Sequence, residues 1–306
     1  MPLHDLAAAA VAAALSLMTV SAQEPPQTSP PPQEAVQLGD VTVEGRRLAE
    51  MARDFVGEIA APAQRRGLAR WRGDICVGVA NLEGEAARYI ADRVSTIAED
   101  LGLAPGEPGC TANILVVFAD DGEALAAALV DHNRRAFRMG VGGVDRGGAA
   151  LERFATGDRA VRWWQVSLPV DRDTRERAVR LPGDLSPPVT TVRGVSRLNS
   201  QVVDELNKAI VIVDVDLLDG TDIVQLADYV AMVSLAQVDP DADTAGFDTV
   251  LNVFADPGSA PGLTPWDWSY LEALYGSERM RQNPQSIADE VADGLVRSRR
   301  ASPEAE

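Results

Sequence analysis

Residues 209–215 have the sequence AIVIVDV, a short, apolar and β-branched run that predicts a buried β-strand. The segment that follows, residues 221–237 (TDIVQLADYVAMVSLAQ), has the length and the apolar spacing of a helix. After an acidic loop, residues 263–276 (LTPWDWSYLEALYG) predict a second helix. The order strand, helix, loop, helix therefore organises the second half of the chain.

The rest of the chain alternates between strand and helix patterns. Its expected strands are residues 75–80, 113–119, 162–170 and 189–195, and its expected helices are residues 46–64, 83–101, 123–133 and 284–297. This alternation predicts an α/β or α+β fold with a mixed sheet covered by helices.

The N-terminus has the features of an export signal. Residues 6–20 form an apolar stretch, and small residues precede an expected cleavage after Ala22. An uncleaved anchor is the alternative, but this run is shorter than the roughly 20 apolar residues that span a bilayer. No later segment is long and apolar enough to cross a membrane. We therefore expect a periplasmic or secreted protein without a transmembrane span after signal cleavage.

Composition divides the chain into five regions, with a boundary at the proline-rich sequence LPGDLSPP of residues 181–188. The expected regions are a signal peptide (1–22), a disordered Pro-rich linker (23–37), an α/β N-terminal part (38–185), a C-terminal part (186–298) and a disordered tail (299–306).

The two cysteines of the chain are consistent with export. Cys76 begins one predicted strand and Cys110 precedes another, so an oxidising compartment would favour a disulfide between them. A reactive thiol is the alternative interpretation. It is disfavoured because the cysteines lack the CxxC spacing of redox sites.

Charge and motif content exclude several functions. The formal net charge of −18 repels phosphate backbones and anionic lipids, so nucleic acid is not an expected partner. The glycine-rich residues 139–148 depart from the G-x-G-x-x-G pattern of dinucleotide-binding loops, and we expect no cofactor.

The C-terminal third resembles part of a metzincin-type zinc metallopeptidase domain, a member of the zincins. In that family a strand leads into a helix with the motif H-E-x-x-H, and a closing helix follows. Residues 209–215 and 221–237 match the strand and the first helix, while the closing helix matches in Asp267 and in the Leu-Tyr-Gly sequence of residues 274–276. The resemblance implies a zincin-like C-terminal part.

The zinc ligands of that family are absent. The best overlay places Asp228 and Tyr229 where the His-Glu pair would stand and Met232 where the second His would stand. Methionine is a poor zinc ligand, a tyrosine cannot act as the carboxylate base, and His132 lies far away in the sequence. With Asp267, these residues are the degenerate-site positions. The alternative is that Asp228 has a structural role, capping a helix or pairing with an arginine.

A larger part of the chain resembles a family of uncharacterised secreted bacterial proteins. The pattern in this chain consists of Arg70-Trp71, Cys76, Leu226-Ala227-Asp228-Tyr229, Asp239-Pro240-Asp241 and Leu274-Tyr275. The resemblance implies export but no known activity.

Three aspartates have the rhythm of a calcium-binding loop. Asp239, Asp241 and Asp243 alternate as in D-x-D-x-D, which can direct carboxylates toward one cation. However, Thr244 stands where the sharp-turn glycine belongs, and Val250 stands where the bidentate glutamate belongs. An EF-hand is excluded, and both a looser calcium site and a solvated acidic turn remain open.

These patterns predict an exported envelope protein in which a degenerate peptidase-like fold serves binding or structure, with a protein or another envelope component as partner. The alternative is a metal-dependent or carboxylate-based hydrolase of unrecognised type. Neighbouring strand residues point to opposite sides, so one of Trp163 and Trp164 is expected to be exposed. A cleft with convergent polar groups would favour the enzyme, and an exposed aromatic patch would favour binding.

Overall fold

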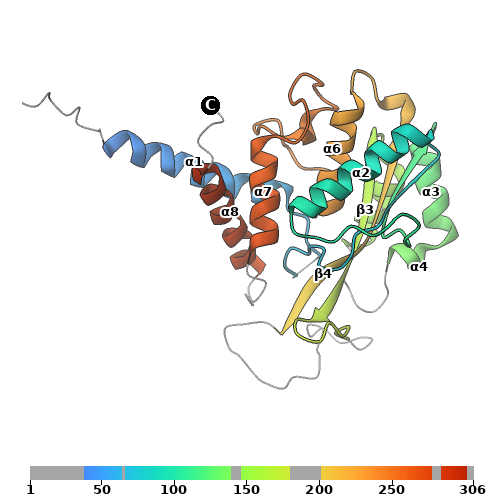
Figure 1. The fold of residues 1–306 in the computed structure, drawn as a ribbon, viewed down its shortest axis with the longest axis horizontal. Coiled ribbons are helices and arrows are strands. Elements are labelled where there is room, and N and C mark those ends of the chain that lie inside the picture. The colour runs from blue at the N-terminus through green and yellow to red at the C-terminus, as the bar shows by residue number, and fades with distance from the viewer. Residues whose placement is uncertain (1–37, 64–65, 139–145, 180–200, 278–283, 302–306) are drawn as a thin grey trace, which may run out of the picture.

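The protein has an α+β fold built on one mixed sheet (Figure 1). The computed structural model describes residues 38–63, 66–138, 146–179, 201–277 and 284–301. The predicted signal peptide, linker, boundary sequence and strand at 189–195 lie outside these residues. No helix among the described residues has the length and apolar character needed to span a membrane.

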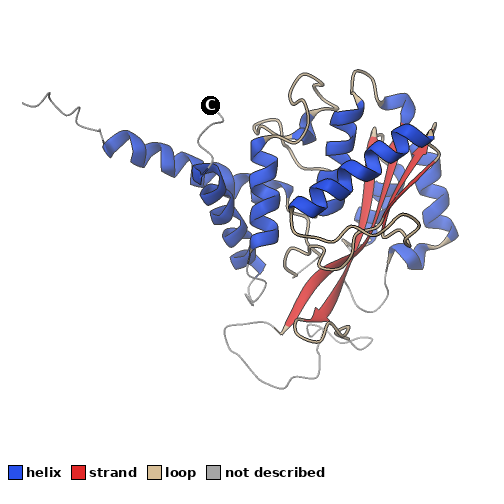
Figure 2. Cartoon of the chain, viewed as in Figure 1, coloured by secondary structure: helices blue, strands red, loops and turns tan. Residues whose placement is uncertain are grey.

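The sheet has the strand order β1-β2-β4-β3. Strands β1 (Val77–Ala80), β2 (Ile114–Ala119) and β4 (Val202–Asp214) run parallel, and β3 (Val161–Asp171) pairs antiparallel with β4 at the edge. Figure 2 shows β3 and β4 extending well beyond the two shorter strands. Because β4 lies between β2 and β3, the N-terminal and C-terminal parts share one sheet. The boundary predicted between residues 185 and 186 therefore does not separate two cores.

Helices cover both faces of the sheet. Helices α2 and α6 pack on one face, together with α1, α7 and α8 beyond them, while α3, α4 and α5 lie on the other face. The bounds are α1 (Leu38–Ile59), α2 (Gly84–Asp100), α3 (Gly122–His132), α4 (Arg134–Phe137), α5 (Gly148–Thr156), α6 (Ile223–Leu235), α7 (Pro265–Gly276) and α8 (Pro284–Ala301). Two 3₁₀ turns, η2 (Val215–Leu217) and η3 (Val250–Asn252), flank α6 in sequence. The last helix thus includes the first three residues of the predicted disordered tail.

The alternation of side chains along the strands creates two hydrophobic clusters. In β4, Val211 and Val213 join the main cluster under α2 and α6, whereas Ile212 joins the smaller cluster under α3 and α5. Trp163 and Trp164 follow the same rule, and both are buried. The expectation that one tryptophan would be exposed is therefore wrong, because helices cover the sheet on both sides.

Helix α6 is the central helix of the main cluster. It begins with a capping box in which Asp222 accepts hydrogen bonds from the backbone of Val224 and Gln225. Every residue from Gln225 to Leu235 is buried, which explains the nearly continuous apolar sequence.

The predicted disulfide is confirmed. Cys76 and Cys110 are bonded, with their Cα atoms 6.0 Å apart. The bond ties the entry of β1 to the segment that precedes β2, two neighbouring strands of the sheet. Its closed loop contains all of α2, so the bond restrains the unfolded chain around that helix.

Candidate functional site

Asp228 is a buried structural carboxylate. Its side chain lies on α6 and accepts two hydrogen bonds from Arg93 of α2, at 2.5 Å from Nε and 3.0 Å from Nη2. The backbone N–H of Leu263 donates a third, at 2.7 Å. The hydrogen bond with Asp228 raises the pKa of the Arg93 guanidinium. Asp228 therefore joins α2, α6 and the entry to α7.

Asp267 plays a comparable role one helix further along. It is fully buried in the first turn of α7 and accepts hydrogen bonds from the Thr249 hydroxyl (2.6 Å) and the Val250 backbone (2.8 Å). The backbone and hydroxyl of Thr264 each donate another at 3.0 Å. Burial raises the pKa of Asp267 to about 6, and the four donors act against this rise. The carboxylate thus fixes η3 to the start of α7.

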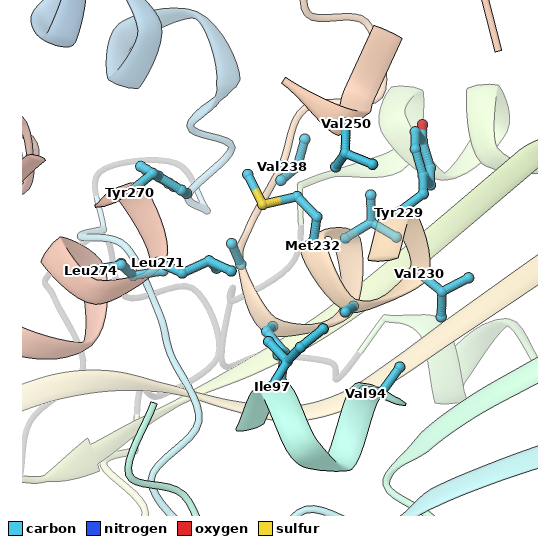
Figure 3. Packing of buried hydrophobic residues seen from close by; sticks show 14 of the residues in the cluster. Val94, Ile97, Tyr229, Val230, Met232, Val238, Val250, Tyr270, Leu271 and Leu274 are labelled. Carbon is cyan, nitrogen blue, oxygen red and sulfur yellow. The ribbon is translucent and has the colours of Figure 1, made fainter. Parts of the chain in front are cut away.

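Met232 and Tyr229 differ in their surroundings although they share a helix. Figure 3 shows Met232 extending from α6 toward Val238 and Tyr270, within the main cluster, where it is fully buried. The ring of Tyr229 extends in another direction, and its hydroxyl points away from Val94 and Ile97 below. Burial of the ring raises the pKa of Tyr229. Of the four degenerate-site positions, Tyr229 lines an open cleft.

That cleft, the tyrosine cleft, is open and has a volume of about 570 Å³. Its walls come from the start of β3, from η2 and from the loop that follows α6. The lining includes Trp163, Leu217, Tyr229, Ala245 and Phe254. The Tyr229 ring packs edge-on against Phe254 (4.7 Å) and Trp163 (6.0 Å). Aromatic side chains therefore form its inner wall.

A second cleft, the acidic cleft, adjoins the first and has a volume of about 500 Å³. It lies at the carboxyl ends of β2 and β4, where ligands commonly bind in open α/β sheets. Asp158 and Leu217 line both clefts. The charged residues of the acidic cleft are Asp120, Asp121, Glu123, Asp158, Asp214, Asp216 and one cation, Arg162.

Two of the three predicted calcium ligands pair with arginines. Asp239 pairs with Arg146 at 2.6 Å, and Asp241 pairs with Arg153 at 2.8 Å and also with Arg159. Asp243 accepts a hydrogen bond from the backbone of Ala245. Within the described part of the chain, no group of three His, Cys, Asp or Glu side chains lies close enough to hold a metal ion.

The early residues of the secreted-protein pattern contact the helices of the C-terminal third. The Trp71 indole donates to the Ser234 carbonyl at the end of α6 (2.8 Å), and Arg70 donates to the Ser277 carbonyl after α7 (2.9 Å). Arg70 also lies over the ring of Tyr275. These pattern residues stabilise the packing of the two halves.

His132, the histidine considered as a distant ligand, is exposed in the last turn of α3. Helix α3 covers the opposite face of the sheet from α6, so the structure does not bring His132 to the degenerate-site positions. Comparisons of this chain with family models, with curated proteins and with solved structures found no match.

The two clefts were missed at the level of sequence. The available signal was a pair of acidic residues directly after the predicted strand 113–119, Asp120 and Asp121, and another pair around the end of the predicted strand 209–215, Asp214 and Asp216. The carboxyl ends of neighbouring parallel strands meet at one edge of a sheet, so these acids were candidates for a shared site.

Proposed function

We propose that the protein is an exported envelope component that binds an extended segment of a partner protein, without hydrolysing it, on a degenerate peptidase-like fold. The observation that carries the proposal is that the four degenerate-site positions fall into two groups. Asp228, Asp267 and Met232 are occupied by hydrogen bonds or by core packing, while Tyr229 lines an open cleft. Binding at this place requires no nucleophile, base or metal.

The tyrosine cleft has the size and lining of a recognition site. Its volume of about 570 Å³ lies in the range of ligand-binding clefts, roughly 300–1,000 Å³. Its aromatic wall favours a large apolar or aromatic side chain. Leu217 of this cleft belongs to η2, and η2 and the first turn of α6 expose Val215, Leu217, Ile223 and Val224. Exposed apolar side chains beside a cleft, such as Leu217, favour contact with a partner.

The backbone beside the cleft favours an extended partner. The Ala160 carbonyl accepts a hydrogen bond from Asp214 of β4 at 2.8 Å, so the backbone groups of the next residue, Val161, point away from β4. β3 is an edge strand, and Val161 also lines the cleft. A peptide strand can add to such an edge by main-chain hydrogen bonds while its side chains enter a neighbouring pocket.

Export is supported by the disulfide and by the expected signal peptide. A bonded pair of cysteines is typical of proteins outside the reducing cytosol.

The aspartate-arginine pairs around Asp241 and the carboxylates of Asp228 and Asp267 are all engaged within the fold. These contacts disfavour a hydrolase that would use Asp228, Asp241 or Asp267 as its catalytic carboxylate.

The test is selection of random linear peptides on the purified protein with its disulfide intact. We expect enrichment of peptides that contain an aromatic or large aliphatic residue. The variant Ala245→Trp places a bulky ring in the cleft at an exposed position and should weaken binding about tenfold or more. Ala128→Trp, on the exposed side of α3 and outside both clefts, is the matched control.

Two outcomes would contradict the proposal. Peptides that bind the Ala245→Trp variant as tightly as the wild type would place the site elsewhere. Cleavage of the selected peptides during incubation, detected by mass spectrometry, would support the hydrolase alternative instead.

A further inference from the structure

Arg162 has unmet hydrogen-bonding capacity at the base of the acidic cleft. The residue lies in β3 and is only 2% exposed. Its Nη1 donates to the Phe154 carbonyl at 3.2 Å, whereas its Nε is buried without a partner and no described residue accepts from its Nη2. A guanidinium whose buried Nε has no acceptor is unusual, because buried donors are nearly always satisfied.

The unused edge of Arg162 faces the acidic end of the sheet. A β-carbon added at Gly122, the first residue of α3, would lie 3.5 Å from Arg162 Nε and 3.3 Å from an oxygen of Asp214. Nε and Nη2 together form the side of a guanidinium that pairs with a carboxylate through two parallel hydrogen bonds. Burial lowers the pKa of Arg162, and the charges of Glu123, Asp214 and Asp121 oppose this shift.

The carboxylates around Arg162 are largely unpaired. Asp120, Glu123, Asp158 and Asp216 are exposed, and none forms an ion pair or a side-chain hydrogen bond with another described residue. Six acidic residues and one arginine line the cleft, so its field is strongly negative. The field attracts a cation, while Arg162 requires an acceptor oxygen.

A ligand with one charge cannot meet both requirements. A simple carboxylate would pair with Arg162 but would be repelled by the surrounding acids, and a simple amine would leave Arg162 unsatisfied. We propose that the acidic cleft binds the zwitterionic head group of an α-amino acid. The carboxylate lies on Nε and Nη2 of Arg162, and the ammonium lies among the neighbouring aspartates and Glu123. The volume of about 500 Å³ also accommodates a side chain.

This inference goes beyond the proposed function and does not depend on it. The two clefts share Asp158 and Leu217, so an amino acid in one would lie beside a peptide in the other. The acidic cleft can nevertheless be tested with variants that do not line the tyrosine cleft. Failure of either proposal is thereby distinguished from failure of the other.

The experiment compares three probes by calorimetry and by NMR of the arginine Nε–H groups. They are L-leucine, its decarboxylated analogue isoamylamine and its deaminated analogue 4-methylpentanoate. We expect leucine to bind about tenfold or more tightly than either analogue and to shift the Arg162 signal. Arg162→Gln should abolish this preference, while Arg72→Gln, a more exposed arginine outside both clefts, should retain it.

A second variant keeps the test valid if Arg162→Gln fails to fold. Asp120→Asn combined with Asp216→Asn alters exposed residues, so the fold should persist. It should weaken leucine binding and strengthen 4-methylpentanoate binding, because repulsion of the carboxylate falls. The proposal is overturned if isoamylamine binds as tightly as leucine, if no probe binds, or if the double variant leaves the preference among the three probes unchanged.

Discussion

Two sets of carboxylates in this protein behave in opposite ways. The inner set, Asp228 and Asp267, is buried, and each carboxylate accepts hydrogen bonds from three or more donors that join separate elements. The rim set, represented by Asp120 and Asp216, is exposed and has no ion-pair partner among the described residues. The inner carboxylates lie at degenerate-site positions, and the rim carboxylates line a cleft.

The difference implies that the inner carboxylates contribute to stability and that the rim carboxylates contribute to ligand recognition. Buried charges are retained only when donors satisfy them, so removing an inner carboxylate leaves several groups without partners. Unpaired exposed charges contribute little to folding and can even oppose it by mutual repulsion. We therefore expect inner substitutions to change the free energy of unfolding and rim substitutions to change ligand binding.

The largest effect is expected for Asp267→Ala. This change leaves donors from Thr249, Val250 and Thr264 without an acceptor in the core. The loss should be about 4–5 kcal/mol of unfolding free energy, measured by denaturant titration monitored by tryptophan fluorescence. A loss below about 1 kcal/mol would show that the inner carboxylate does not hold α7 in place.

The disulfide provides a reference that lies outside both clefts. Replacing Cys76 and Cys110 by serine opens a loop with a sequence separation of 34. Chain entropy predicts a loss of about 3–4 kcal/mol, measured by the same titration. Peptide binding by the folded fraction should remain unchanged, and a loss of binding affinity would mean that the bond positions a cleft.

The pH dependence of stability tests the environment of Asp267. Its folded-state pKa of about 6 lies above the ordinary value of 3.8, so the folded protein binds this proton more tightly than the unfolded chain. The corresponding stabilisation is present below about pH 4 and is lost as the pH rises through about 6. The wild type should therefore lose about 2–3 kcal/mol relative to the non-titrating variant Asp267→Asn between about pH 4 and 7. A constant difference between the two proteins would contradict the raised pKa.

Asp228→Asn should have a smaller effect than Asp267→Ala. The Arg93 side chain is 33% exposed, so it can turn toward water when its partner loses charge. The amide still has an oxygen that can accept from Leu263. We expect a loss of about 2 kcal/mol in thermal or chemical unfolding. Arg66→Gln, which breaks the ion pair with Asp204 elsewhere, is a matched control for a partly buried pair.

The smallest stability change is expected at the rim. Asp120→Asn combined with Asp216→Asn should alter the free energy of unfolding by less than about 0.5 kcal/mol. The change should be a gain in stability, because the double variant relieves repulsion among the exposed carboxylates. Unfolding curves at low ionic strength would measure this best. A loss above about 1 kcal/mol would place these residues with the inner set.

Most of the fold was predictable because periodicity and β-branching are local signals. Residues 83–101 correspond to α2, residues 113–119 to β2, and residues 209–215 to the end of β4. The first part of β4 was missed because it mixes polar and charged residues with apolar ones. The burial of both Trp163 and Trp164 depends on helices from distant parts of the chain, which no local pattern reveals.

The candidate site was less predictable for the same reason. Asp228 and Asp267 drew attention by their positions in a motif, but their donors come from α2, η3 and the entry to α7. Arg162 had no signal of its own in the sequence. Its significance arises when β3, α3 and α5 enclose its guanidinium.

The affinity of a cleft-selected peptide for the Asp228→Asn variant, measured at a temperature where the variant is folded, tests the central claim most directly. The account predicts that this affinity stays within about twofold of the wild type, while Ala245→Trp loses about tenfold or more. A comparable loss in Asp228→Asn would contradict the account, because it would make the inner carboxylate part of the binding site.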